Sequence, residues 1–81
     1  MTREDVLSKV IDILKKYSKA EIADTDIVAG TSILDDLKVN SARLVDIVLD
    51  FEDTFDIEVE DEDADKVRTV GDGVDLILSK L

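Results

Sequence analysis

Ser41 is the residue of this chain whose position best suits chemistry, because it stands at the head of an amphipathic segment. At about 100° per residue, Leu44, Val48 and Phe51 fall on one side of a helix that runs to about Asp56. The apolar side is Leu44, Val48, Phe51 and Phe55, widened by Val45, Ile47 and Leu49, and the opposite side is Arg43, Asp46, Asp50 and Asp53. The sequence therefore predicts a helix that is buried on one face and acidic on the other, with a serine in its first turn.

Three roles for Ser41 are consistent with this position. Asn40 or Ser41 could cap the helix by accepting a hydrogen bond from a free backbone N–H group, which is worth about 1 kcal/mol. A serine nucleophile acting alone is disfavoured, because the chain has no histidine to take its proton. In the third role another enzyme modifies the serine, and the helix N-terminus would stabilise a phosphate group attached there.

Length, charge and missing residue types restrict the classes of function. Eighty-one residues allow one domain, spanning 1–81, with a modest core and no deep active-site cleft. A net charge of −11 excludes nucleic acid and anionic membranes as partners, because their phosphates would repel the chain, and favours a basic protein surface. Without cysteine or histidine, the chain lacks disulfides, thiolate metal sites and the commonest neutral metal ligand. No secretion signal or membrane-spanning apolar run is present, so we expect a cytoplasmic protein that does not insert into membranes.

Two further segments have the pattern of capped helices. Thr2 and Asp5 resemble a capping box, and a helical apolar period follows to about Tyr17. Thr69 and Asp72 repeat the pattern before a final helix. Its apolar stripe is Val70, Val74, Ile77, Leu78 and Leu81, with Leu76 off the stripe and exposed.

The remaining segments have no long helical period. Residues 18–38 carry irregularly spaced aliphatic side chains, which indicates a long ordered loop pinned to the core, with a short helical turn near Ile33. Residues 60–66 favour a short helix that turns Ala64 and Val67 inward. The predicted fold is therefore all-α, a small four-helix bundle of three longer helices and one short helix, with a long loop between the first and second helices.

The acids at 61–65 also have the spacing of a calcium-binding EF-hand loop. Asp61, Asp63 and Asp65 match its first, third and fifth positions, and Asp72 falls at the twelfth. However, Lys66 occupies the sixth position, where glycine is needed for the turn, and the twelfth is normally a bidentate glutamate. We therefore interpret these residues as a solvated acidic helix and predict no metal site.

Acidic residues dominate the middle of the sequence. Every charged residue between Leu44 and Asp65 is an aspartate or a glutamate. Like charges one helical turn apart, such as Asp46 and Asp50, destabilise a helix by about 0.2–0.5 kcal/mol. Because this arrangement has no benefit inside the fold, it favours recognition by a basic partner.

Several segments of the chain resemble acyl carrier proteins. They are Asp36-Leu37-Lys38-Val39-Asn40-Ser41, residues 45–59, residues 61–67 and Thr69-Val70-Gly71-Asp72, and the resemblance extends to the length, the acidity and the long first loop. It implies a four-helix bundle in which Ser41 carries 4′-phosphopantetheine as a phosphodiester, transferred from coenzyme A by a phosphopantetheinyl transferase. It also implies that the thiol of this arm holds acyl groups as thioesters and that the chain itself is not an enzyme.

Three features differ from the usual pattern of that family. Asn40-Ser41-Ala42 stands where Asp-Ser-Leu is usual, and Arg43 stands where an acid is common. Lys38-Val39 replaces a pair that usually contains glycine. We interpret the chain as a specialised carrier in fatty acid, polyketide or related lipid biosynthesis, and not as the housekeeping carrier.

The resemblance also implies that the second helix contacts partner enzymes. These partners are the transferase and the acyl-transferring and chain-modifying enzymes, which have basic docking surfaces. The residues expected to contact them are Arg43, Leu44, Asp46, Ile47, Asp50 and Asp53. We expect the carrier to be a monomer. The alternative function is an acidic protein-interaction module in which Ser41 only caps the helix.

Overall fold

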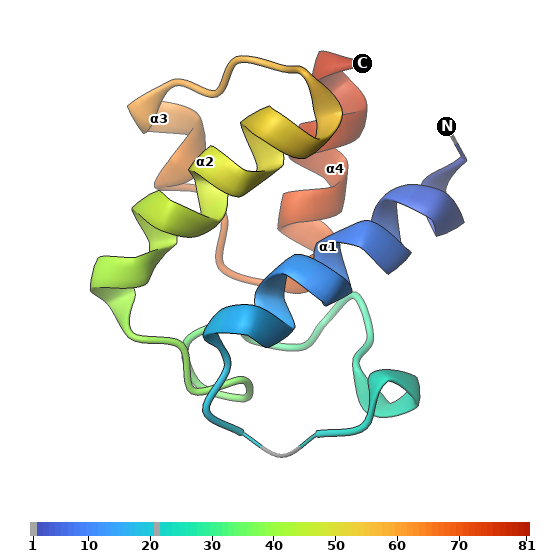
Figure 1. Cartoon of the computed structure of the whole chain (residues 1–81), viewed down its shortest axis with the longest axis vertical. Helices are drawn as coiled ribbons and strands as arrows, with labels where there is room; N and C mark the ends of the chain where they lie inside the picture. Colours follow the sequence, from blue (N-terminus) through green and yellow to red (C-terminus); the bar gives the residue numbers. More distant parts are fainter. Residues whose placement is uncertain (1, 21) are drawn as a thin grey trace.

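The architecture is all-α. In the computed structural model, which describes residues 2–20 and 22–81, the α-helices are α1 (Arg3–Tyr17), α2 (Leu44–Phe55), α3 (Asp61–Ala64) and α4 (Val70–Lys80). Of the two 3-10 turns, η1 (Asp24–Asp26) lies in the long connection between α1 and α2, and η2 (Ser41–Arg43) leads directly into α2. Figure 1 shows the connection across one end of the bundle. The predicted arrangement of three longer helices, one short helix and a long first loop is confirmed. None of the described helices is long and apolar enough to cross a membrane.

Capping boxes start α1 and α4, as the sequence predicts. The Thr2 hydroxyl accepts a hydrogen bond of 3.2 Å from the Asp5 N–H, and the Asp5 carboxylate accepts one from the Thr2 N–H. Thr69 and Asp72 form the same reciprocal pair at the start of α4. Because each pair satisfies two backbone N–H groups at a helix start, local sequence is enough to fix where these helices begin.

The hydrophobic core joins α1, α2, α4 and the long connection. The large side chains that are almost completely buried are Val6, Val10, Leu14, Ile33, Leu37, Ile47, Phe51, Val70, Val74 and Ile77. α1 packs against both α4 and α2, so it lies at the centre of the helix packing. Burial of one such side chain stabilises the fold by roughly 1.5–3 kcal/mol, which makes these residues the main source of stability.

The long connection is ordered because it pairs with the segment that precedes α4. The Ile33 N–H donates a hydrogen bond of 3.0 Å to the Arg68 carbonyl, and the Val70 N–H donates one of 3.0 Å to the Thr31 carbonyl. The connection also places four aliphatic side chains in the core, namely Ile27, Ile33, Leu37 and Val39. The prediction that its aliphatic residues pin the loop to the core is therefore confirmed.

The buried face of α2 is narrower than the sequence predicts. Val45 and Leu49 are 65% and 52% exposed, although the sequence places them on the apolar side. Both lie at the same edge of the apolar arc, where a small rotation of the helix decides between core and solvent. In α4 the predictions for two leucines are also wrong, because Leu76 is half-buried against the core and the terminal Leu81 is exposed.

α3 is a single helical turn, shorter than the predicted helix at 60–66. Ala64 is half-buried and Val67 is buried, so the predicted inward direction of both side chains is confirmed. Asp61 and Asp63 lie in this helix and not in a calcium-binding loop, which excludes the EF-hand interpretation. Among the residues that the structure describes, no group of three or more acidic side chains is placed to hold a metal ion.

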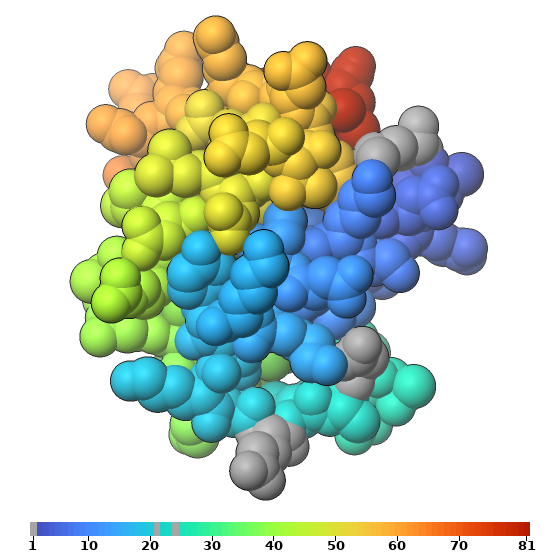
Figure 2. Space-filling view, in the orientation of Figure 1, coloured from blue at the N-terminus to red at the C-terminus, as the bar shows by residue number. Residues whose placement is uncertain are grey.

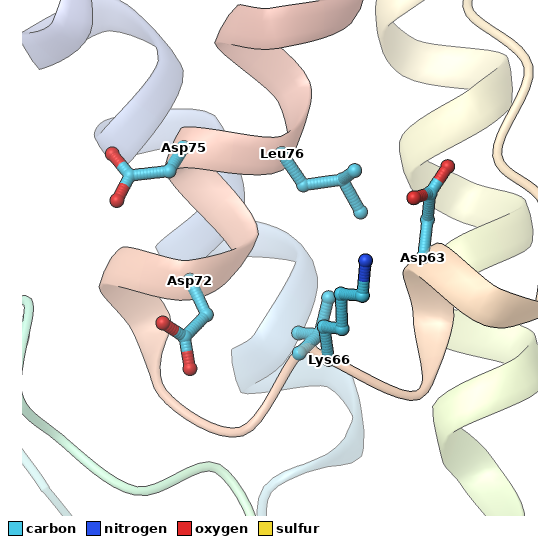
Figure 3. A pocket seen from close by; sticks show the side chains of 6 residues that line it. Asp63, Lys66, Asp72, Asp75 and Leu76 are labelled. Atoms are coloured by element: carbon cyan, nitrogen blue, oxygen red, sulfur yellow. The ribbon is translucent and has the colours of Figure 1, made fainter.

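An ion pair ties α3 to the end of α4. The Lys80 Nζ lies 3.1 Å from an Asp63 carboxylate oxygen, and this contact lowers the pKa of the Asp63 carboxyl below its ordinary value. A cavity of about 250 Å³ separates the two helices, with the amino group of Lys66 pointing into it between Asp63 and Leu76 (Figure 3). The Asp63–Lys80 ion pair therefore joins α3 to the end of α4 beside this cavity.

Candidate functional site

Ser41 lies exposed in η2, and its neighbour Asn40 provides the cap. The Asn40 side-chain oxygen accepts a hydrogen bond of 2.9 Å from the Ala42 N–H, while the Asn40 backbone is extended, as is typical of a capping residue. The Ser41 hydroxyl makes no hydrogen bond to any residue that the structure describes. Of the two candidates for the cap, Asn40 takes this role, and Ser41 is left exposed.

Two buried side chains fix the segment that leads to Ser41. Leu37 is 1% exposed and Val39 is 4% exposed, and the Val39 N–H donates a hydrogen bond of 3.2 Å to the Ile33 carbonyl. Lys38 lies between these anchors with φ 53°, in the left-handed region. A residue with a Cβ atom is less stable there than glycine by roughly 1–2 kcal/mol, which gives a physical reason for the glycine that is usual in this part of the family pattern.

The C-terminal end of α1 is joined to the same segment. The Leu37 carbonyl accepts hydrogen bonds from the Ser18 hydroxyl at 2.6 Å and from the Lys19 N–H at 3.2 Å. The loop before Ser41 is therefore attached both to the core and to α1. Ser41 is thus presented by a segment that is anchored on two sides.

The apolar residues after Ser41 divide between core and surface. Ile47 has no exposed surface, so the prediction that it contacts partners is wrong. The helical period places Ile47 and Leu44 on the same apolar face, so it could not show that only Ile47 is fully buried. Leu44 is half-buried and lines a cavity of about 400 Å³ near the start of α2. The other residues around that cavity are Ser32, Leu34, Asp35, Asp65, Val67 and Arg68.

Val45 and Leu49 form an exposed apolar strip on α2 that the sequence interpretation missed. They border a small cavity of about 90 Å³ between α2 and the region of α3, together with Val48, Glu52, Val59, Asp61 and Ala64. Glu52, whose position falls between Val48 and Val45 on the helical wheel, lies half-buried at the edge of this cavity. The signal in the sequence was the position of Val45 and Leu49 together at one margin of the apolar arc, one helical turn apart.

Two of the three aspartates predicted on the docking face already have partners inside the chain. An Arg43 guanidinium nitrogen lies 3.0 Å from the Asp46 carboxylate. Asp50 accepts a hydrogen bond of 2.7 Å from the Tyr17 hydroxyl, and the Lys16 Nζ lies 3.9 Å away. Figure 2 shows the surfaces of α1 and α2 next to each other on one face of the molecule.

The third aspartate, Asp53, is exposed, and no ion pair joins it to another described residue. The structure therefore brings Arg43, Asp46, Asp50 and Asp53 to the surface of α2 as predicted, but with different electrostatic surroundings. Tyr17 also takes part, and its pKa is raised above the ordinary value, first by its hydrogen bond to Asp50 and then by burial. No local pattern could have indicated this contact, because the two residues lie 33 positions apart.

Known proteins match this chain over almost its whole length. Residues 5–77 match the family described as phosphopantetheine attachment site. An acyl carrier protein of Thermotoga maritima is 39% identical over 80 residues, covering 99% of this chain and 96% of the relative. One of an Exiguobacterium species is 41% identical over 81 residues and covers both chains completely.

A solved structure agrees with these relatives. The structure of acyl carrier protein from Enterococcus faecalis superposes with a TM-score of 0.83, at 41% identity and with 100% of both chains covered. Proteins of this kind are carriers and not catalysts, and their cofactor is covalently attached 4′-phosphopantetheine. The chain therefore belongs to the acyl carrier protein family.

Proposed function

We propose that Ser41 carries the 4′-phosphopantetheine arm and that the chain holds acyl intermediates in fatty acid, polyketide or related lipid biosynthesis. The observation that carries this proposal is the exposed Ser41 in η2, the turn that leads into α2: its hydroxyl has no described hydrogen-bond partner, because Asn40 caps this turn. The alternative function, an acidic interaction module with Ser41 as the cap, assigns Ser41 a role that Asn40 already performs.

The other serines are less suited to attachment. The hydroxyls of Ser18 and Ser79 donate to backbone carbonyls at 2.6 Å, and the Ser32 hydroxyl accepts a hydrogen bond of 3.1 Å from the Asp35 N–H. Ser8 is exposed but lies within α1, where the backbone N–H groups are bonded inside the helix. The start of a helix, by contrast, offers free N–H groups and the positive end of the helix dipole to a phosphodiester.

The attachment reaction requires little from this chain beyond an accessible hydroxyl. The Ser41 oxygen would form a P–O bond to the phosphorus next to the pantetheine of coenzyme A, and 3′,5′-ADP would leave with the electrons of the broken P–O bond. The proton of the hydroxyl would pass to a base of the transferase, because this chain has no histidine. When attached, the arm supplies a thiol that holds acyl groups as thioesters.

The partners proposed for this carrier are a phosphopantetheinyl transferase and acyl-transferring or chain-modifying enzymes with basic docking surfaces. Support comes from the exposed face of α2, where Asp53 is free of described ion pairs and Val45 and Leu49 offer apolar contact. Arg43, placed two residues after Ser41, supports a specialised carrier, since it presents a cation where basic partners approach.

We also propose that residues 1–81 act as one carrier domain and as a monomer in the cytoplasm, where coenzyme A is available to the transferase. The monomer is supported by the net charge of −11, because two copies of so acidic a chain repel each other.

Intact mass measures the attachment directly. Wild type and the variants Ser41→Ala and Ser8→Ala are incubated with a phosphopantetheinyl transferase and coenzyme A. Wild type and Ser8→Ala should gain the mass of one phosphopantetheine unit, and Ser41→Ala should gain none. A gain on Ser41→Ala would overturn the attachment site, and no gain on wild type would favour the interaction module.

A further inference from the structure

The carboxylate of Asp50 is held from the neighbouring helix. The Tyr17 hydroxyl, at the last residue of α1, donates a hydrogen bond of 2.7 Å to an Asp50 oxygen. The Lys16 Nζ lies 3.9 Å from the same oxygen. Tyr17 is half-buried and packs against the core, so the position of its hydroxyl is set by the fold and not by solvent.

This contact changes what α2 presents to a basic partner. The Asp50 side chain is 29% exposed, so a partner can still reach it, but one of its oxygens already accepts a hydrogen bond from a neutral donor. Lys16, whose side chain is 64% exposed, adds a positive charge beside it. A partner cation that approaches Asp50 therefore meets a carboxylate that is partly satisfied and a lysine that repels it.

We propose that Lys16 and Tyr17 are specificity-determining residues of the docking surface, which weaken the attraction of α2 for strongly basic partner enzymes. The inference rests on the proposed carrier function and extends the docking surface from α2 onto the end of α1. The partner that fits this surface binds Asp53 with a basic residue and faces Lys16 with an acidic one. A partner that binds Asp50 with its own cation must displace Tyr17 and Lys16 from it.

The test compares the variants Lys16→Gln and Tyr17→Phe with wild type as substrates of a phosphopantetheinyl transferase whose carrier-binding surface is basic. Lys16→Gln removes the repelling charge, and Tyr17→Phe removes only the hydroxyl while keeping the ring in the core. Arg3→Gln is the matched control, because it also removes one positive charge and one exposed ion pair, here to Asp75 on α4. Thermal unfolding of each variant checks that the fold is kept.

The KM for the carrier should fall in Lys16→Gln and in Tyr17→Phe by about two- to five-fold at low salt, the size expected for one exposed charge pair. The kcat should stay unchanged, and the difference in KM should disappear at high salt, since screening removes the attraction. Arg3→Gln should resemble wild type.

A second readout follows binding without catalysis. Tyr17 is the only tyrosine of the chain, so incorporation of 3-fluorotyrosine gives a single fluorine resonance. The resonance should shift when the transferase binds, in the direction produced by Asp50→Asn in the free carrier. If wild type is modified, but the KM values of Lys16→Gln and Tyr17→Phe equal that of Arg3→Gln, this inference is overturned. The carrier function is left intact by that result. No modification of wild type would overturn the carrier function, and this inference with it.

Discussion

The Tyr17 hydroxyl donates a hydrogen bond of 2.7 Å to Asp50, and so joins the end of α1 to the middle of α2. The negative carboxylate favours the neutral phenol, which raises the pKa of Tyr17 above its ordinary value of 10.0. As far as the ionisation of Tyr17 is concerned, the same linkage means that the contact makes its full contribution to stability below the pKa of the unfolded tyrosine. This stabilisation is lost as the pH rises through the higher pKa of the folded state.

Replacement of Asp50 by asparagine should therefore lower the pKa of Tyr17 toward 10.0. The measurement is the ultraviolet absorbance of the phenolate against pH, which reports on Tyr17 alone because the chain has no tryptophan and no other tyrosine. Asp53→Asn is the control, since it removes the same charge from α2 without touching Tyr17. An unchanged pKa in Asp50→Asn would show that burial, and not this hydrogen bond, raises it.

Gly71 and Gly73 both lie in the first turn of α4 but should respond in opposite ways to alanine. A Cβ atom at Gly71 would lie 2.9 Å from the Ala29 carbonyl oxygen, and the Gly71 N–H donates to that same oxygen at 2.8 Å. A Cβ atom at Gly73 would meet Phe51 at 3.6 Å, which is an ordinary contact. Gly71→Ala should therefore destabilise the fold by about 1–3 kcal/mol, because the long connection must shift away from α4.

Gly73→Ala should stabilise it by up to about 1 kcal/mol, through better helix propensity. Urea unfolding of the two variants beside wild type gives both free energies. Equal effects of the two substitutions would mean that helix propensity alone determines the outcome and that the approach of Ala29 to α4 is not tight.

Local patterns in the sequence determined much of this fold. The capping boxes at Thr2 and Thr69 were recognisable because each uses two side chains three residues apart. The buried stripes of α1, α2 and α4 followed from the helical period, although Val45 and Leu49, at one margin of the α2 stripe, were wrongly predicted to be buried. The need for glycine at position 71 could not be predicted, since it depends on Ala29, which is brought close only by the tertiary fold.

The candidate site shows the same limit. The sequence placed Ser41 at a helix start, but it could not decide between Asn40 and Ser41 as the cap, because both have short polar side chains that suit this position. The side-chain hydrogen bond decides, because the Asn40 side-chain oxygen accepts from the Ala42 N–H at 2.9 Å. The contact of Asp50 with Tyr17 depends on the packing of two helices and has no signature in either segment.

Stability should increase when salt or a divalent cation is added. Between Asp46 and Asp65 all charged side chains are acidic, and the ion pairs of this segment among the described residues involve Asp46, Asp50 and Asp63. The remaining carboxylates repel one another across a solvent-exposed surface, and added ions screen that repulsion. The thermal midpoint is followed against magnesium chloride and, at matched ionic strength, against sodium chloride. No increase with either salt would mean that this repulsion is already compensated in the fold.

Arg43 offers the sharpest distinction between a specialised carrier and an ordinary one. It lies exposed two residues after Ser41, with its guanidinium 3.0 Å from the Asp46 carboxylate. The arginine therefore adds a cation to the docking face and also neutralises an acid that a basic partner would use. Arg43→Asp replaces the cation with an acid and frees Asp46 from its ion pair. Rates of modification and acylation by generic fatty-acid enzymes should therefore rise, most strongly at low salt.

The control for Arg43→Asp is Ala42→Leu, which restores the leucine usual after the attachment serine without changing the charge. Both side chains lie exposed in the same 3-10 turn, so the two substitutions test charge and shape at nearly the same place. If electrostatics exclude the generic enzymes, Arg43→Asp increases kcat/KM and the increase falls with ionic strength, because screening shortens the range of the attraction. If Ala42→Leu raises the rates while Arg43→Asp leaves them unchanged, the discrimination is steric, and the role assigned to Arg43 is wrong.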